Sequence, residues 1–146
     1  MTAFDATGRL PRQSLAEVAF VWFQRVIAGY CLLFGVLYWI RLIGVYPGVL
    51  WRFDLMPVYW QVAGVVLAVF FPFAASGLWM LASWGPVIWA ICAVTETVMY
   101  VGFPDLFGHR PIIPVSHILV ALLYVLFRVV IHVEKLREAS RRDSAQ

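Results

Sequence analysis

The sequence predicts an all-α protein: a bundle of four transmembrane helices with both termini on the cytoplasmic side. Two observations predict this fold. The 146 residues are 63% hydrophobic and only 13% charged, whereas soluble domains carry roughly 25% charged residues. The apolar residues also gather in long runs, which short segments containing Gly and Pro separate. Because a soluble fold of this size could not cover so much apolar surface, lipid must solvate most of it.

The first span follows a polar segment, residues 1–14, which is predicted to be a loose cytoplasmic tail. Ser14-Leu15-Ala16-Glu17 fits a capping box, so a helix should begin at Leu15. The apolar run continues until Gly44 ends it. A helix of this length exceeds the hydrocarbon thickness of about 30 Å. We therefore expect the span itself to cover about residues 22–43.

The segment between the first two spans, residues 45–57, is too short and too polar to cross a membrane. Aromatic residues such as Trp51 favour the membrane interface. We predict a loop or a one-turn helix in the outer interface. The second span, residues 58–81, contains no charged residue, and Pro72 should kink it.

The third span is predicted at residues 86–101, with Pro86 at the first helical position, where proline is favoured. The fourth span, residues 115–133, follows a polar segment that contains two prolines. One membrane domain, residues 15–133, thus holds all four spans. Residues 134–146 form a charged cytoplasmic tail.

The basic residues predict the orientation. With the N-terminus inside, eight basic residues lie in or beside the cytoplasmic segments, and only Arg41, Arg52 and Arg110 lie outside. This excess agrees with the positive-inside rule, and an even number of spans puts both tails on one side.

Glu96 is the clearest candidate for a functional residue. It lies about ten residues into the third span, in the middle or outer half of the membrane, where an ionisable group is costly. Arg41, Gln61 and His117 reach a similar depth from the other three spans. We predict that these four residues form a buried polar cluster, with Glu96 either paired to Arg41 or protonated.

Other arrangements of the same residues stay open. Arg41 could extend to the outer head groups and His117 could face water, which would leave Glu96 bonded to Tyr100 or to a threonine. The polar residues would then only tie helices together, at about 0.6 kcal/mol each. The alternative is a ligand, proton or ion site.

Residues at the cytoplasmic boundary are expected to contact lipid. Arg25 and Arg128 are predicted to anchor the chain at the membrane surface or to bind an anionic lipid head group. Cys31 and Cys92 lie inside apolar runs and are expected to be small buried packing residues. Small residues should let helices pack closely, so bulky substitutions at Gly64 or Gly77 should impair assembly. These small residues are Gly29, Gly35, Ala63, Gly64, Ala68, Ala74, Ala75 and Gly77.

The sequence lacks the residues that several kinds of functional site require. His117 and His132 lie about 22 Å apart along one helix, so they cannot face each other across a haem. The sequence has no clustered zinc ligands, no paired cysteines, no phosphate-binding glycine loop and no nucleophile elbow. Its basic residues flank apolar segments, which argues against nucleic acid as a partner. We predict no enzymatic activity, cofactor or metal.

Three segments carry a resemblance to a known family: Leu50-Trp51-Arg52-Phe53-Asp54-Leu55-Met56-Pro57, Trp60-Gln61 and Ser83-Trp84-Gly85-Pro86. With these segments, about residues 20–133 resemble an uncharacterised family of short four-span proteins from rhizobium-like alphaproteobacteria. The plan is also similar, in fold alone, to four-span bundles related to the DoxX proteins. The resemblance implies a bacterial inner membrane and brings no established activity or site residues.

Three functions fit these observations. The leading hypothesis is a non-enzymatic accessory or structural protein that contacts lipid or other membrane proteins, as a homo-oligomer or in a larger complex. The second is a small proton-linked transporter in which Glu96 titrates. The third is a lipid- or quinone-binding redox accessory with an aromatic rim at Trp51, Phe53, Trp60 and Phe103, although such rims are common interfacial belts.

Overall fold

The computed structural model describes residues 14–143, and every regular element in that range is helical. Four helices are long and apolar enough to cross a membrane: Leu15–Ile43, Val58–Trp79, Gly85–Gly102 and Ile112–Arg141. The predicted all-α, four-helix architecture is therefore confirmed. Of the predicted tails, 1–14 and 134–146, residues 1–13 and 144–146 lie outside the described residues.

Helix α1 (Leu15–Ile43) begins and ends where the sequence predicts, because both ends are capped. The Ser14 hydroxyl accepts a hydrogen bond from the Glu17 backbone N–H at 3.2 Å, and the Glu17 carboxylate accepts one from the Ser14 N–H at 3.4 Å. Gly44 adopts a left-handed conformation (φ 78°) that ends the helix. One stripe of α1 is buried, at alternating spacings of four and three residues: Gln24, Ala28, Cys31, Gly35 and Tyr38.

Helices α1 and α2 (Val58–Trp79) form the most extensive helix interface. The 3-10 turn η1 (Phe53–Leu55) precedes α2 and matches the predicted one-turn helix. Pro72 lies inside α2, and its ring occupies the space beside Gly35, where an added Cβ would lie only 2.6 Å from the Pro72 Cδ. The missing side chain at Gly35 thus lets the two helices approach closely.

A second close contact joins α2 to α3 (Gly85–Thr97) across the turn between them. A Cβ added at Gly85 would lie 2.5 Å from the carbonyl carbon of Gly77, and one added at Gly77 would collide with the Trp84 ring. Gly64 has more room, since its Cβ would meet Leu42 at an ordinary 3.4 Å. The tight packing expected at both Gly64 and Gly77 is therefore found at Gly77.

The last third of the chain contains features that the sequence did not predict. Helix α3 continues as a π-helical segment, η2 (Val98–Gly102), and a short helix α4 (Pro104–Phe107) follows. Helix α5 runs from Ile112 to Asp143, ten residues past the predicted end of the fourth span. The residues after the apolar run are mostly Glu, Lys, Leu, Arg and Ala, which are good helix formers.

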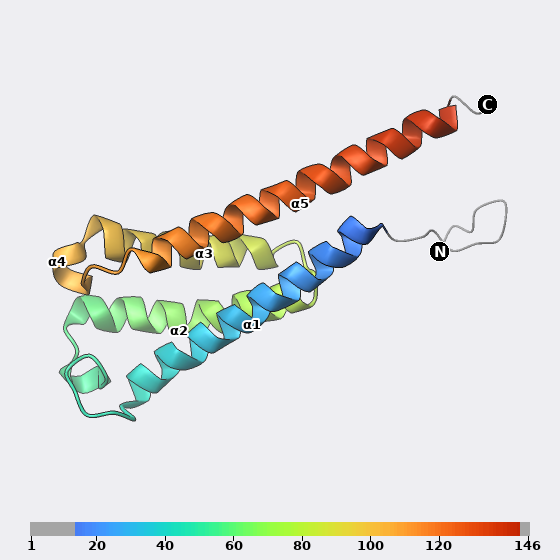
Figure 1. The fold of residues 1–146 in the computed structure, drawn as a ribbon. Coiled ribbons are helices and arrows are strands. Elements are labelled where there is room, and N and C mark those ends of the chain that lie inside the picture. Colours follow the sequence, from blue (N-terminus) through green and yellow to red (C-terminus); the bar gives the residue numbers. More distant parts are fainter. Residues whose placement is uncertain (1–13, 144–146) are drawn as a thin grey trace.

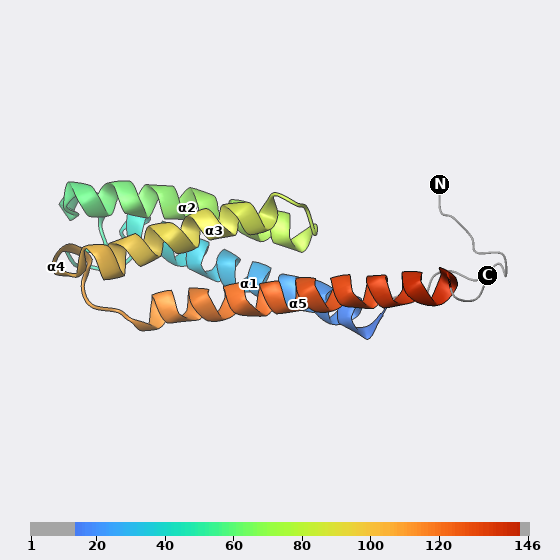
Figure 2. The same ribbon diagram turned by 90° about the horizontal axis from the view of Figure 1, so that it is seen from above.

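The start of α1 and the end of α5 lie at the same end of the bundle, and η1 and α4 lie at the other (Figure 1). We call these the terminal end and the loop end. Near the terminal end, the Phe23 and Phe127 ring centroids are 5.3 Å apart, and Lys135 Nζ lies 3.2 Å from Glu17 Oε1. The last turns of α5 extend beyond α1 (Figures 1 and 2).

Candidate functional site

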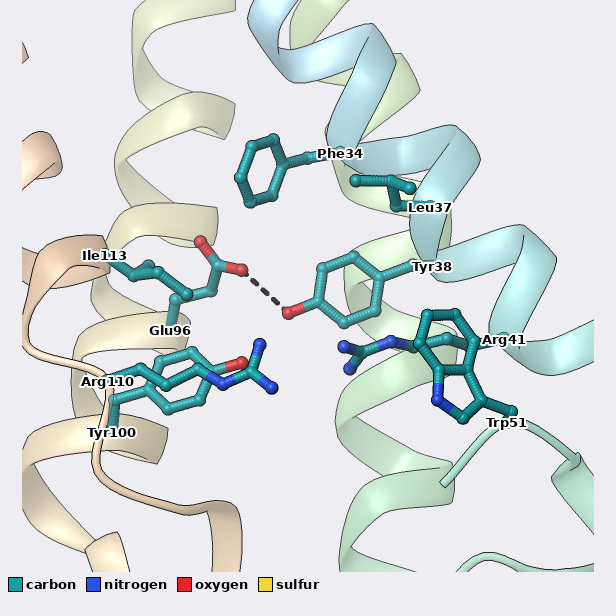
Figure 3. A pocket seen from close by; sticks show the side chains of 9 residues that line it. All are labelled: Phe34, Leu37, Tyr38, Arg41, Trp51, Glu96, Tyr100, Arg110 and Ile113. Carbon is teal, nitrogen blue, oxygen red and sulfur yellow. Dashed lines mark hydrogen bonds between the residues drawn. The ribbon is translucent and has the colours of Figure 1, made fainter. Parts of the chain in front are cut away.

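Glu96, in the last turn of α3, is fully buried with 0% of its surface exposed. Side chains from two other helices bind its two carboxylate oxygens. The Tyr38 hydroxyl of α1 donates a hydrogen bond to Oε1 at 2.7 Å (Figure 3), and His117 Nε2 of α5 lies 2.8 Å from Oε2. Tyr38, Glu96 and His117 therefore form a hydrogen-bonded triad that joins three of the four long helices.

The contact between Glu96 and His117 can hold its proton on either side chain. An imidazole Nε2–H can donate to a carboxylate, and a protonated carboxyl can donate to a neutral Nε2. In both forms the hydrogen bond is kept, so a proton can shift between the two groups without loss of the contact. The Tyr38 hydroxyl acts as a donor to the other oxygen in either case.

Aromatic rings surround the triad. The Tyr38 ring stacks on Phe71 at a centroid distance of 6.0 Å, and the Trp89 ring meets the His117 ring edge-on at 6.0 Å. The neighbouring threonines take no part, because Thr95 and Thr97 donate to the backbone carbonyls of their own helix at 2.8 and 2.7 Å. A threonine as the partner of Glu96, one of the alternatives above, is therefore wrong.

A cavity of about 200 Å³ opens beside the triad toward the loop end. Its lining residues come from α1, α3, η2, the start of α5 and two connecting segments, and they are Phe34, Leu37, Tyr38, Arg41, Trp51, Glu96, Tyr100, Arg110 and Ile113. Figure 3 shows the guanidinium groups of Arg41 and Arg110 pointing into this space from opposite walls. Glu96 thus lies at the inner wall of a cavity with two cationic side chains.

The structure brings together two of the four residues in the predicted cluster, Glu96 and His117. Arg41 lines the adjacent cavity, but its described contacts are with aromatic rings: 4.9 Å from the Trp51 centroid and 5.4 Å from that of Trp60. The predicted pairing of Glu96 with Arg41 is therefore replaced by pairing with His117.

Gln61 lies outside the triad. Its Nε2 donates to the backbone carbonyls of Phe53 and Met56, at 2.8 and 3.1 Å. The sequence predicted how deep Gln61 lies in the membrane but not the direction in which its side chain faces. On α2 this side chain faces η1 rather than Glu96. Tyr38, which sequence reasoning left out of the cluster, is the partner that replaces it. The buried four-and-three stripe of α1 could have indicated Tyr38.

We expect Gln61→Leu to loosen the segment before α2 and to leave the triad intact. Two hydrogen bonds to backbone carbonyls are lost, each contributing about 0.5–1.5 kcal/mol. Amide hydrogen exchange should accelerate in residues 51–57. Ser116→Ala is the matched control, because the Ser116 hydroxyl donates to the Ile113 carbonyl of its own helix and has no described hydrogen bond to residues 51–57. Unchanged exchange in Gln61→Leu would contradict this role.

The two candidate lipid-binding arginines occupy different places. The Arg25 guanidinium lies over the rings of Trp22 and Trp79, at 5.7 and 5.6 Å from their centroids. Arg128 is exposed on α5, in a groove with Tyr124, Val125, Val129, Ile131, His132 and Lys135, and Arg25 is not among the residues that line it. Arg25 therefore has the aromatic neighbours of an interfacial anchor, and Arg128 has basic ones.

A comparison with known protein families identifies the family of this chain. A family model matches residues 18–135, which include all of the triad and the whole cavity lining. The chain belongs to the DUF6163 family. DUF6163 is described as a family of unknown function, which agrees with the resemblance to an uncharacterised family. No curated protein and no solved structure matched the chain.

The described residues contain no group of three or more His, Cys, Asp and Glu side chains that could hold a metal ion. Both cysteines are free and have 0% of their surface exposed, as predicted for packing residues. The triad and its cavity are thus the site whose arrangement calls for a functional explanation.

Proposed function

We propose that this DUF6163 protein is a non-enzymatic, multi-pass protein of the bacterial inner membrane with both termini in the cytoplasm. Four helices of sufficient length and hydropathy support membrane insertion. The start of α1 and the end of α5 lie at one end of the bundle, which is compatible with tails on one side (Figure 1). The excess of basic residues near those tails supports the cytoplasmic assignment.

Within that membrane the protein acts through contacts with lipid or with other membrane proteins, including further copies of itself. The observation that carries this proposal is the Tyr38–Glu96–His117 triad. Both oxygens of the fully buried Glu96 carboxylate are bound by side chains of other helices. Such an arrangement holds helices in a defined position, which an accessory protein requires in order to present a constant surface.

Helix α5 has few buried side chains that could hold it against the other helices. Only Pro114 and His117 of its described side chains are buried, and most of its apolar residues face outward. Packing therefore provides little to hold α5 against the bundle, and the bond from His117 to Glu96 contributes a specific attachment. The outward face of α5 is then available to lipid or to a protein partner.

If the triad serves only to hold the helices together, two results are expected for Glu96. Glu96→Gln should lower the free energy of unfolding by no more than about 1 kcal/mol, because an amide can still accept from Tyr38 and contact His117. The infrared carboxyl bands of the wild-type protein, identified by difference from Glu96→Gln, should stay constant between about pH 5 and 8. Glu134 is outside the triad, so Glu134→Gln controls for bands from other carboxyl groups.

A proton-linked carrier is the second candidate, and one observation favours it: Glu96 borders the cavity that opens at the loop end. A carrier needs a titrating group that solvent can reach. In this case the Glu96 carboxyl band would change within the same pH range, and Glu96→Gln would stop transport while leaving expression normal. A Glu96 carboxyl band that changes with pH would contradict a purely structural role for the triad.

A further inference from the structure

Arg41 and Arg110 carry positive charges that no described acidic side chain neutralises. Neither takes part in an ion pair or in a side-chain hydrogen bond within residues 14–141, whereas Arg52, at the same end, pairs with Asp54 at 2.8 Å. Glu96 is the one acidic residue in the cavity lining, and both of its oxygens are bound by Tyr38 and His117. The cavity therefore has two cations and a single carboxylate that is already occupied.

The surroundings of Arg41 leave its donors available. The rings of Tyr38, Trp51 and Trp60 attract the guanidinium through their π-electrons and fix its position. These ring faces do not replace strong hydrogen-bond acceptors, so the N–H groups of Arg41 can still bind an oxygen ligand. Arg110 approaches from the opposite wall, on the segment before α5 (Figure 3).

From this geometry we infer that the cavity binds the oxyanion group, carboxylate or phosphate, of a small anion between Arg41 and Arg110. Guanidinium groups donate paired hydrogen bonds to both kinds of oxyanion, with a strength that the charges increase. Apart from Glu96, whose two oxygens are bound by Tyr38 and His117, no described side chain in the cavity lining offers an opposite charge to the two arginines. The inference goes beyond the proposed function, since a helix tie needs no ligand.

The cavity limits the size and polarity of this anion. Its volume of about 200 Å³ is below the roughly 300–1,000 Å³ of pockets for drug-sized molecules. Phe34, Leu37 and Ile113 form apolar parts of the wall, which suit a short hydrocarbon or a ring next to the oxyanion. The group could be supplied by a free small solute or by the phosphate of a lipid head group, and the chemistry of recognition is the same.

The test uses the full chain in an uncharged maltoside detergent, which contains no phosphate. Benzoate and inorganic phosphate are the probes, and calorimetry and tryptophan fluorescence measure binding, because Trp51 lies against Arg41. Arg110→Gln and Arg41→Gln should each weaken binding about tenfold or more, the cost of a charged hydrogen bond. Arg52→Gln is the matched control and should bind like the wild type, because Asp54 already pairs with that guanidinium.

The source of the oxyanion is separated by adding phosphatidylglycerol to the same samples. Displacement of benzoate by the lipid, with lipid retention lost in Arg110→Gln, identifies a head group; benzoate binding that the lipid does not affect identifies a free solute. Either result supports the site. The inference is wrong if neither probe nor lipid binds, or if Arg110→Gln binds as tightly as wild type. Arg110 is exposed and lies between helices, so this variant should fold normally. A negative result would leave the helix tie untouched.

Discussion

Replacement of Glu96 by alanine is expected to lower the free energy of unfolding by about 2–4 kcal/mol. The change leaves the buried Tyr38 hydroxyl and the buried His117 imidazole without their shared partner. Loss of one member of a buried ion pair costs about 3–5 kcal/mol in soluble proteins, and single interhelical hydrogen bonds in membranes contribute about 0.6–1.7 kcal/mol. Two such bonds are lost here, so an intermediate value follows.

Unfolding of the purified protein in mixed micelles measures this effect, and hydrogen exchange should show α5 opening first. Asp105→Ala is the matched control, because Asp105 is exposed on α4 and its loss should change stability by less than about 0.5 kcal/mol. Glu96→Gln should fall between the control and Glu96→Ala, since glutamine keeps an acceptor for Tyr38. Equal stability of Glu96→Ala and Asp105→Ala would show that the triad does not hold the helices.

The second large effect is expected for Gly77→Ala, at about 2–3 kcal/mol of destabilisation. The new methyl group would collide with the Trp84 ring and lie 2.7 Å from the Cα of Gly85. A flexible side chain could move aside, but the Gly85 backbone begins α3 and cannot shift without moving that helix. Thermal unfolding and the fraction of monodisperse protein after purification would both decrease.

Two other glycines provide controls for this substitution. Gly29→Ala should be neutral or stabilising, because nothing lies within 4 Å of the added Cβ and alanine favours helix by about 0.5–1 kcal/mol. Gly64→Ala should give a value between the two, since Leu42 is at 3.4 Å. If Gly77→Ala were as stable as Gly29→Ala, the close contact between α2 and α3 would not contribute to the fold.

The four long helices could be predicted because lipid imposes a simple rule, that long exposed helix surfaces must be apolar. The same rule cannot locate helix ends. Hydropathy placed the end of the fourth span at Val133, where apolar residues stop, but the helix continues because the following residues favour helix in water as well. The π-helical turn at Val98–Gly102 has no distinctive sequence, since it depends on packing of the surrounding residues.

For the site, depth along the membrane could be predicted and rotation about the helix axis could not. Glu96 and His117 share a depth and also face each other. Gln61 has a suitable depth, yet α2 directs it toward η1. The position of Arg41 depends on Trp51, which lies in an irregular segment whose path hydropathy does not determine. Charge and depth alone therefore identified two of the four residues in the predicted cluster correctly, Glu96 and His117.

Because α5 is one uninterrupted helix, a small tilt about one end displaces the other end by a larger distance. No glycine or proline interrupts residues 115–143, so the helix should tilt as one stiff rod. His117 lies near one end of this rod, and its other end lies about 39 Å away at a rise of 1.5 Å per residue. A rotation of about 5° around His117 would thus displace the charged end by about 3 Å. The contacts of Phe127 with Phe23 and of Lys135 with Glu17 lie between His117 and that end, so both would have to shift whenever α5 tilts about His117.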